Sequence, residues 1–575
     1  MKNNASLWLL LGVFCLAAAL RLYLVHTQVP PGMMIDWGDN WSFLTVIELI
    51  KHTKHLPRFD LFFGGIPYVY PPLSLITYTL LYMVLPVSYP HLSNNIAPIM
   101  GSLTVFGVYL LAYALTKDRW VGVLAAYLTM SAPRFLALSS IPIPEMFGHL
   151  QAPVFMYLAY VTAVSKKKAH AVLAGLAGAT LFLNHHLTSA ILVLTVSVYF
   201  LLLAALKLRL AYVRLLVIIL AVSFLLSSPW WFDTVGKNIM NLVVREQEYA
   251  VPPFGDYVQM MSPFTFYVGA IALAYFALAT LWKRDEATTL VFVWSVFTLL
   301  ATQSRHIIKV VLEEQVRANP NLLLVLAPIY GERYFNYMGE PWAIMNAIFI
   351  VSVFYAASSL LAKAFTGAKK EKAKFALAFA GVLLVGYPTL TYNFGVDEPF
   401  MPALDSTVKG LGVGDPHLNS KSWALWRMVP DVNDSTEYEA SLWMREHLPE
   451  DANIVADYPS GEVISAGAMR KIVGGAELRV TVDVVGVYSD ILNIYYTNDT
   501  DEAVRLMHKR SATHVYVSDR ILARGWLPIT AHSRWPRYSI GFGMRDINEK
   551  KFIESSCFKR IYNQDKIRIY ELLLC

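Results

Sequence analysis

Long apolar segments recur along this 575-residue chain, and they restrict its fold more than any other feature. A helix that crosses the hydrocarbon core of a bilayer needs about 20 predominantly apolar residues. The segments that meet or approach this length are Ser6–Val25, Asn94–Thr116, Trp120–Leu138, Leu150–Val164, Ala169–Leu183, Ser189–Leu206, Arg214–Phe232, Pro263–Trp282, Thr288–Gln303, Pro341–Leu361 and Phe375–Leu390. This pattern predicts a polytopic α-helical membrane protein with about 11 transmembrane helices.

Composition agrees with a membrane protein and divides the chain in two. Charged residues make up 16% of the sequence, whereas they make up about 25% of soluble domains. The polar residues collect after about Asn393. We therefore expect a transmembrane domain over residues 1–392 and a water-soluble α/β domain over residues 393–575. Within the transmembrane domain, residues 26–93 are expected to form a large first outer loop with surface helices.

The short apolar run Pro72–Pro86 decides the predicted orientation. If this run lies in the first outer loop as a surface or half-inserted helix, all the short basic loops fall on the side of Lys2. These loops are Lys117–Arg119, Lys166–Lys168, Lys207–Arg214, Lys283–Arg284 and Lys363–Lys374. Because Lys and Arg favour cytoplasmic loops, we expect the N-terminus in the cytoplasm and the C-terminal domain outside the cell membrane. The basic residues thus indicate orientation rather than a nucleic-acid partner.

The C-terminal part alternates helix and strand patterns. Thr436–Glu439 is a capping-box pattern that opens an amphipathic helix ending before Pro449. The other expected elements are a strand Asn453–Ala456 that ends in a turn over Asp457–Gly461, a helix Ala503–Lys509 capped by Asp499-Thr500, a strand His514–Val517, and a strand Lys566–Leu573 at an edge of the sheet. Alternating helices and strands predict βα units and a layered sheet.

The cysteines and the sequons carry weaker signals. The three cysteines are Cys15, in the first apolar segment, and Cys557 and Cys575, near the end of the chain. That number is too small for a disulfide framework or for a cysteine-based metal site. Two of the Asn-X-Ser/Thr sequons, Asn433-Asp434-Ser435 and Asn498-Asp499-Thr500, are compatible with an exported surface.

Asp36 and Asp39 lead the candidate functional residues, because they follow the first span directly. Two carboxylates three residues apart face one way on a helix. They could hold a divalent cation such as Mg²⁺ or Mn²⁺ against a phosphate-bearing substrate. One of them could instead act as a general base on an acceptor hydroxyl. The alternative is that Asp39 and Asn40 only cap the amphipathic helix Trp41–Lys51.

A second acidic turn, Pro142–His149, is expected on the same face of the membrane. Glu145 and His149 are four residues apart, so they share a face if a helix begins near Pro144. This spacing suits two ligands of one metal ion, or a base and its orienting partner. Alternatively, Glu145 only stabilises the positive end of a Pro-initiated helix, which leaves His149 unexplained.

Histidines and arginines complete the outer-face set. His185 and His186 lie between two apolar segments, where ionisable groups indicate function. Adjacent residues point in different directions on a helix, so at most one of these histidines is expected to serve the site. Arg305 and Arg333 precede the last two spans. Arg333 could clamp a phosphate through its planar guanidinium group, although Arg at membrane interfaces is also common without function.

The sequence lacks the motifs of several other classes. It contains no Walker A motif, no G-x-G-x-x-G after a strand, no H-E-x-x-H and no G-x-S-x-G. ATP-driven transport and serine hydrolase chemistry therefore have no support.

Taken together, these features resemble the GT-C superfamily of membrane glycosyltransferases. The resemblance lies in a first span, a large outer loop with an early Asp, a Tyr70-Pro71-Pro72-Leu73 start to a second surface helix, a second acidic turn and an outer C-terminal domain. It implies a polyprenyl-phosphate-linked sugar donor and an Asp that acts as base or metal ligand. That role falls on Asp39, or on Asp36 if the helix starts earlier. The second acidic position falls on Glu145.

The C-terminal domain adds a narrower resemblance. Residues Ala440–Ala452 look like the start of the outer domain of archaeal oligosaccharyltransferase catalytic subunits. The acceptor-binding signature W-W-D-Y-G of that family should follow, but this chain has Ala456-Asp457-Tyr458-Pro459, which lacks both tryptophans. It also has a lone Glu145 in place of a D-x-D. The resemblance therefore implies a divergent relative, similar also to uncharacterised archaeal polytopic membrane proteins.

The sequence thus predicts a membrane glycosyltransferase that transfers a sugar from a polyprenyl-phosphate donor to a glycan, lipid or protein acceptor on the extracytoplasmic face. The predicted catalytic residues are Asp39, Asp36 and Glu145, with Asp39 and Glu145 as ligands if a metal takes part. The residues expected to contact substrate are Arg333, His149, His185, His186, Tyr70 and Arg305.

Two other classes compete with this prediction. A lipid or solute transporter or flippase predicts inverted repeats and ionisable groups near the bilayer midplane. The sequence shows no repeat, and its candidate acids lie in loops. A non-catalytic membrane-anchored surface protein would not need so many spans.

Overall fold

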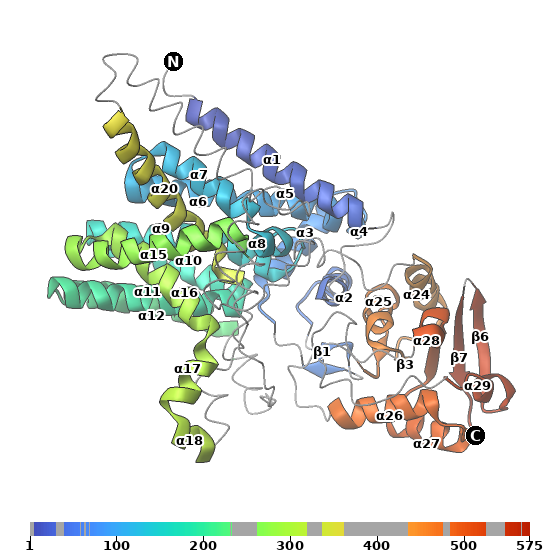
Figure 1. Cartoon of the computed structure of the whole chain (residues 1–575). Coiled ribbons are helices and arrows are strands. Elements are labelled where there is room, and N and C mark those ends of the chain that lie inside the picture. The colour runs from blue at the N-terminus through green and yellow to red at the C-terminus, as the bar shows by residue number, and fades with distance from the viewer. Residues whose placement is uncertain are drawn as a thin grey trace, which may run out of the picture. The chain divides into compact units, whose positions relative to one another are not determined.

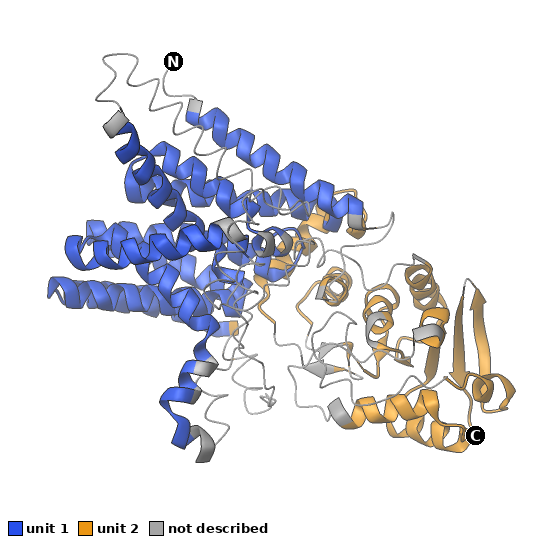
Figure 2. Cartoon of the chain, in the orientation of Figure 1, with its two compact units in different colours: residues 1–27, 93–229, 244–428 blue, residues 28–92, 230–243, 429–575 orange. Residues whose placement is uncertain are grey.

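The computed structural model of the chain describes residues 5–29, 39–57, 59–62, 65–67, 70–230, 232, 261–318, 336–361, 435–474, 484–524, 547–564 and 566–575. The chain divides into two compact units, which Figure 2 distinguishes by colour. Unit 1 comprises residues 1–27, 93–229 and 244–428. Unit 2 comprises residues 28–92, 230–243 and 429–575, so the first loop and the C-terminal segment belong to one unit. The predicted boundary between residues 392 and 393 lies outside the described residues and stays a prediction.

Unit 1 consists of helices (Figure 1). In chain order these are α1 (Ala5–Gln28), α5 (Ala97–Ser102), α6 (Thr104–Thr116), α7 (Arg119–Ser131), α8 (Pro133–Leu138), α9 (Pro144–Ser165), α10 (Lys168–Asn184), α11 (His186–Lys207), α12 (Ala211–Trp230), α15 (Pro263–Lys283), α16 (Glu286–Thr302), α17 (Ser304–Val311), α18 (Glu313–Ala318) and α20 (Gly339–Leu361). The helices pack in pairs such as α6 with α7, α9 with α10, and α7 with α20.

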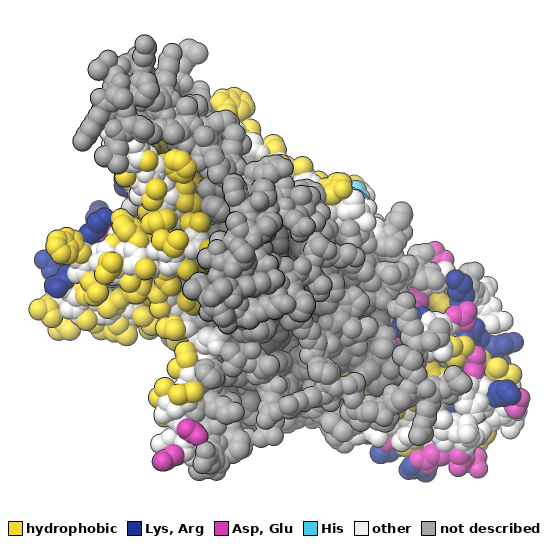
Figure 3. Space-filling model, in the orientation of Figure 1, with side chains coloured by type: hydrophobic (Ala, Val, Ile, Leu, Met, Phe, Trp, Pro, Cys, Tyr) yellow, Lys and Arg dark blue, Asp and Glu magenta, His cyan; other side chains and the backbone are white. Residues whose placement is uncertain are grey.

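Six helical segments among the described residues are long and apolar enough to cross a membrane. They are Ser6–Thr27, Tyr89–Thr116, His186–Lys207, Ala211–Trp230, Thr265–Lys283 and Gly339–Ser359. Two shorter apolar helices are Leu73–Val84 and Glu286–Thr302. Hydrophobic side chains cover the visible sides of the helices of unit 1, and Lys and Arg side chains gather at helix ends on the left of Figure 3. The chain is therefore a helical integral membrane protein, as its apolar segments predicted.

Several of the expected spans differ in the structure. Trp120–Leu138 is interrupted, because α7 ends at Ser131 and α8 begins at Pro133. Proline lacks an amide N–H and disfavours helical geometry in the residue before it. Leu150–Val164 and Ala169–Leu183 lie in α9 and α10, but neither helix is among the six segments. Phe375–Leu390 lies outside the described residues.

The run that decided the orientation forms a short helix. Pro72–Pro86 contains α3 (Leu73–Val84), which has 12 residues. At 1.5 Å per residue, α3 is about 18 Å long, which is too short to cross a bilayer core of about 30 Å. Its length agrees with a helix of the first loop rather than a span.

Unit 2 is built around a five-stranded sheet with the order β4-β3-β5-β7-β6. Strand β3 pairs in parallel with β4 and β5, and β7 pairs antiparallel with β5 and β6. The elements of the unit are α2 (Asp39–Thr53), β1 (Phe59–Asp60), β2 (Ile66–Pro67), α3, α4 (Tyr89–His91), α24 (Ser435–His447), β3 (Asn453–Val455), α25 (Tyr458–Ala468), β4 (Lys471–Ile472), α26 (Val484–Tyr496), α27 (Thr500–Lys509), β5 (His514–Ser518), α28 (Asp519–Arg524), α29 (Lys550–Glu554), β6 (Phe558–Gln564) and β7 (Ile567–Leu572).

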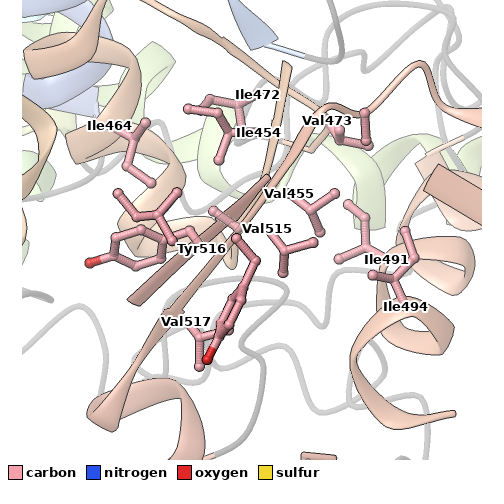
Figure 4. Packing of buried hydrophobic residues seen from close by; sticks show 14 of the residues in the cluster. Ile454, Val455, Ile464, Ile472, Val473, Ile491, Ile494, Val515, Tyr516 and Val517 are labelled. Atoms are coloured by element: carbon pink, nitrogen blue, oxygen red, sulfur yellow. The ribbon is translucent and has the colours of Figure 1, made fainter. Parts of the chain in front are cut away.

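The core of unit 2 lies where helices cover this sheet. Figure 4 shows Ile454, Val455, Val515 and Val517 from the central strands packed with residues such as Ile491 of α26. All five residues of β5 are buried. A fully buried strand flanked by helices fits the parallel part of a layered α/β unit. The C-terminal segment therefore forms a mixed α/β sheet region, as predicted.

Two local expectations for unit 2 were wrong. Asp457 does not open a turn: it caps α25, and its side chain accepts a hydrogen bond from the Ser460 backbone N–H. The last strand, β7, does not lie at an edge, because β6 pairs with its outer side. Residues Phe558–Gln564 of β6 show no strict alternation of buried and exposed positions, so the sequence pattern did not reveal this strand.

A disulfide joins Cys557 to Cys575, whose Cα atoms are 5.6 Å apart. The cysteine count argued against a disulfide framework, and it did not reveal this single bridge. Cys15, in α1, is a free thiol.

Candidate active site

Glu145 lies at the centre of a buried group of polar residues in unit 1. Pro144 occupies the first turn of α9, and Glu145 follows it with only 3% of its surface exposed. Its Oε1 atom accepts hydrogen bonds from Asn336 Nδ2 at 2.6 Å and from the Tyr337 hydroxyl at 2.9 Å. Stabilisation of the helix end alone would need neither of these donors. The carboxylate is therefore oriented by the segment that leads into α20.

Tyr337 extends this group to the start of α11. His185 caps α11, with its Nδ1 2.7 Å from Thr188 Oγ1. The Tyr337 hydroxyl lies 3.2 Å from Thr188 Oγ1 and 3.4 Å from His185 Nδ1. His186 is the half-buried first residue of α11, and its ring centroid is 5.5 Å from that of His185. His185 is thus the histidine that lies against Tyr337.

His149 packs against the same tyrosine from the next turn of α9. Its ring stacks on Tyr337 with the centroids 5.5 Å apart, and Phe135 meets it edge-on at 5.2 Å. His149 Nδ1 lies 3.0 Å from Glu340 Oε1, and both side chains are almost completely buried. Glu145 and His149 therefore contact one common residue, which agrees with their predicted position on one face of a helix.

A buried arginine lies beside the segment that leads to Glu145. Arg21 of α1 is fully buried. Its Nη2 donates a hydrogen bond to Ser139 Oγ at 2.7 Å, and its Nη1 donates one to the Ala17 carbonyl at 3.1 Å. Its guanidinium also lies 5.8 Å from the ring centroid of Phe135. Arg21 thus ties α1 to residues 135–139, a few positions before Glu145.

Gly148 lets α9 and α11 approach closely at this group. A Cβ atom at this position would lie 2.5 Å from Thr188 Oγ1, which is shorter than any ordinary contact between these atoms. Glycine therefore keeps Thr188 within reach of Tyr337.

Asp39 begins α2, as the sequence predicted, although its side chain lies outside the described part of the chain. Helix α2 packs inside unit 2, where Asn40–Glu48 are buried. Thr45 Oγ1 lies 3.0 Å from Ser465 Oγ of α25, and Ser42 Oγ donates to Glu462 Oε1 at 3.3 Å. The helix expected at the membrane surface is therefore held by the C-terminal segment.

The other predicted substrate contacts lie elsewhere or remain undescribed. Tyr70 is 8% exposed, meets Phe43 of α2 edge-on at 5.2 Å, and accepts a hydrogen bond from Trp230 Nε1 through its carbonyl. Arg305 lies in α17, but its side chain is outside the described residues. Asp36 and Arg333 also lie outside them. The roles of these residues stay predictions.

Four residues of the Glu145 group were not predicted from the sequence: Thr188, Asn336, Tyr337 and Glu340. Three of them fall within the short run Asn336–Glu340, directly before the apolar part of α20. The sequence could have indicated these three residues, because they are polar and immediately precede a predicted span. Glu145 and His149 were predicted from the same kind of position.

Asp457 of the C-terminal segment forms an ion pair with an arginine of the same unit. Arg520 of α28 donates to both carboxylate oxygens of Asp457, at 2.7 and 2.9 Å, and to Glu437 Oε1 at 3.0 Å. Burial opposes the charge of Arg520, but the carboxylates of Asp457 and Glu437 raise its pKa above the ordinary value. Asp457 is therefore held in a buried ion pair between α25, α24 and α28.

The described residues do not by themselves compose a metal site. No group of three or more His, Cys, Asp and Glu side chains in the described part of the chain could hold a metal ion. Glu145 is the one proposed ligand whose side chain is described, and one of its oxygens already accepts two hydrogen bonds. A single carboxylate does not bind Mg²⁺ or Mn²⁺ without further oxygen ligands.

No protein-family model and no curated protein matches the sequence, but solved structures match the fold. The oligosaccharyltransferase of Archaeoglobus fulgidus, tethered to an acceptor peptide with an NVT sequon, aligns with a TM-score of 0.60 at 15% identity, over 92% of this chain and 72% of that one. The archaeal oligosaccharyltransferase AglB from Archaeoglobus fulgidus, in complex with an inhibitory peptide and a dolichol-phosphate, aligns with a TM-score of 0.59 at 14% identity, over 90% of this chain and 70% of that one. ArnT from Cupriavidus metallidurans, bound to undecaprenyl phosphate, aligns with a TM-score of 0.53 at 11% identity, over 99% and 98%.

AglB and ArnT are both GT-C membrane glycosyltransferases. The fold of this chain is therefore GT-C-like, which confirms the resemblance found in the sequence. One further structure of the A. fulgidus enzyme contains zinc and sulfate.

Proposed function

We propose that this chain is a glycosyltransferase that moves a sugar from a polyprenyl-phosphate-linked donor to an acceptor on the extracytoplasmic face of the membrane. The observation that carries the proposal is a GT-C-like fold that places an oriented, buried Glu145 at the start of α9. Lipid phosphates support the donor class, because dolichol-phosphate is bound to AglB and undecaprenyl phosphate to ArnT.

The proposed reaction is a displacement at the anomeric carbon of the donor sugar. An acceptor oxygen or nitrogen forms a bond to that carbon, while the bond from the carbon to the phosphate oxygen breaks. The bonding electrons leave with the lipid phosphate, and the proton of the acceptor passes to the carboxylate of Asp39. If α2 is preceded by a further helical turn in the active protein, Asp36 takes this role instead.

The other predicted residues stabilise charge or contact the substrates. Glu145 stabilises the positive charge that develops on the sugar, and Arg333 binds the departing phosphate through its planar guanidinium. His149 and His185 line the donor site beside Glu145. Tyr70, His186 and Arg305 contact the substrates farther from the reacting carbon.

A divalent cation would neutralise charge on the donor phosphate, and Asp39 and Glu145 are the residues that the sequence predicts as its ligands. The proton transfer and the phosphate contact are assigned to the side chains alone.

We also propose an orientation with about 11 spans, a cytoplasmic N-terminus and an extracytoplasmic C-terminal domain. The distribution of basic residues supports it. Lys166 follows the last residue of α9, Lys207 ends α11, and Lys283 ends α15.

A donor panel tests the proposed activity. Purified full-length protein is incubated with radiolabelled polyprenyl-phosphate sugars and membrane extracts as acceptors, and labelled product is counted. We expect transfer from at least one donor and its loss in Asp39→Asn. Asp118→Asn, which alters the cap of α7 on a predicted cytoplasmic loop, is the matched control and should keep the activity. Transfer by Asp39→Asn at the wild-type rate would remove Asp39 from the mechanism.

A further inference from the structure

An exposed sequon lies between two helices of unit 2. Asn498-Asp499-Thr500 connects α26 to α27, and both Asn498 and Asp499 are exposed. Asp499 has extended backbone angles, φ −89° and ψ 113°. We propose that Asn498 is an N-glycosylation site of this protein. The sequence motif alone occurs often by chance, so the proposal depends on the local structure.

At the Asn498 side chain, the carbonyl oxygen forms a hydrogen bond, whereas the nitrogen is the atom that a glycan would join. Asn548 Nδ2 donates a hydrogen bond to Asn498 Oδ1 at 3.0 Å. This bond occupies the carbonyl side of the Asn498 amide and leaves Nδ2, the atom that a glycan would join, on the opposite side. The hydrogen bond also fixes the direction of the side chain, because an amide group is planar.

Within the part of the chain that the structure describes, the hydrogen bonds that hold this turn do not use Asn498 Nδ2. The Asp499 carboxylate accepts hydrogen bonds from the backbone N–H groups of Asp501 and Glu502, and so caps α27. The Asp499 backbone N–H donates to Thr497 Oγ1 at 3.1 Å. A sugar on Asn498 would therefore leave the hydrogen bonds that hold the start of α27 intact.

The surface beside Asn498 has room for the first sugars of a glycan. An open hollow of about 640 Å³ is lined by Asn498, Leu522, Ile547, Asn548, Glu549 and Ile553, together with Lys550. Ile553, one of these lining residues, exposes 55% of its surface. The apolar C–H face of a sugar ring can cover such a residue, while its hydroxyl groups face the polar side chains and water.

The modification is a group transfer from a lipid-linked sugar. Asn498 Nδ2 forms a bond to the anomeric carbon, the bond from this carbon to the lipid-linked phosphate oxygen breaks, and the phosphate leaves with the electron pair. Asn498 Nδ2 gives up one proton to a base of the oligosaccharyltransferase that catalyses the transfer. The cell's own oligosaccharyltransferase and lipid-linked oligosaccharide are the co-reactants, so the proposal does not depend on the activity proposed for this chain.

Mass spectrometry of the full-length chain tests the proposal. The chain is expressed with Asn433→Gln, which removes one sequon whose asparagine lies outside the described residues, in a host that glycosylates exported Asn-X-Ser/Thr sites. We expect a glycan on the Asn498 peptide that disappears in Asn498→Gln and in Thr500→Ala, and that persists in Thr500→Ser.

Glu554→Asn provides the matched control. It creates a sequon with Ser555 and Ser556 at the exposed end of α29 in the same unit. If Asn498 carries no glycan, the proposal is overturned, whether or not the Glu554→Asn site is glycosylated. If Glu554→Asn is glycosylated, the local structure at Asn498 blocks modification. If it is not, unit 2 does not reach the compartment where glycans are added.

Discussion

Tyr337 is the residue that links the buried polar side chains of unit 1. Its hydroxyl donates to Glu145 and lies within 3.4 Å of both Thr188 Oγ1 and His185 Nδ1, and its ring stacks on His149. Hydrogen bonds in such a buried network hold side chains in one arrangement, because an alternative arrangement would leave a polar group without a partner.

Tyr337→Phe removes this hydroxyl and keeps the ring. A hydrogen bond to a charged group contributes about 1.5–3 kcal/mol, so we expect the sugar-transfer rate to fall roughly tenfold to a hundredfold. The maximal rate should fall more than the apparent affinity for the donor. Tyr275→Phe, at a tyrosine of α15 that is 39% exposed, should keep the wild-type rate. Equal kinetics of the two variants would show that Tyr337 does not orient Glu145.

Lys551 is a buried amine in unit 2 whose protonation should affect stability. It is 4% exposed, and its Nζ donates to the carbonyls of Tyr495 and Thr497 at 2.7 and 2.8 Å. Burial lowers the pKa of Lys551 to about 7, whereas an exposed lysine has a pKa of about 10.4. Between these two values the unfolded chain binds a proton that the folded chain does not. The contribution of Lys551 to stability therefore rises with pH through this window.

The melting temperature of the purified protein tests this prediction. Between pH 7 and about pH 9.5, the melting temperature of the wild type should rise relative to that of Lys551→Met. Lys550→Met, at the exposed neighbouring residue, should follow the wild type. A difference between wild type and Lys551→Met that does not change with pH would contradict the low pKa of Lys551.

At the scale of elements, close approach of helices builds the Glu145 group. Helices α9 and α11 come together at Gly148 and Thr188, where a Cβ on Gly148 would lie 2.5 Å from Thr188 Oγ1. Inside a packed helical bundle, such a contact forces either the side chain or the helix to move.

Gly148→Ala should therefore move Thr188 away from Tyr337. Over-packing of this kind costs about 1–3 kcal/mol, and we expect a lower melting temperature together with slower transfer. Gly12→Ala, at a position of α1 with no neighbouring atom within 4 Å, is the matched control. It should leave transfer unchanged and should not lower stability, since alanine favours a helix over glycine. If the two variants behave alike, the contact of α9 with α11 does not support the site.

The helix starts that the sequence predicted correctly are determined by residues that are neighbours in the sequence. Pro144 at the start of α9, Asp39 at the start of α2 and Asp499 as the cap of α27 all follow from contacts within one helical turn. The contacts that complete the candidate site are distant in sequence. Tyr337 meets Glu145 across 192 positions, and Thr45 meets Ser465 across 420. No local pattern specifies which distant segments pack together.

At the scale of the whole molecule, the first loop shares a unit with the C-terminal segment. The Ser42 contact with Glu462 and the Thr45 contact with Ser465 hold α2 on α25, and the Ile472 backbone N–H donates to the Leu61 carbonyl at 2.9 Å. The sequence predicted the soluble segment and the loop as separate parts, because composition reports where a segment lies relative to water and not what it packs against. Asp39 therefore belongs to the part of the molecule built around the five-stranded sheet.

The GT-C-like fold and the buried Glu145 support one central claim: Glu145 acts in the transfer of a sugar from a lipid phosphate. The most direct test is the transfer rate of purified full-length Glu145→Gln with the best polyprenyl-phosphate donor. We expect a loss of at least about a hundredfold, in the range seen when an electrostatic stabiliser is removed. Glu286 accepts hydrogen bonds from Lys207 and Tyr212 and lies outside the Glu145 group. Glu286→Gln should therefore keep the wild-type rate. Transfer by Glu145→Gln as fast as by the wild type would contradict the claim.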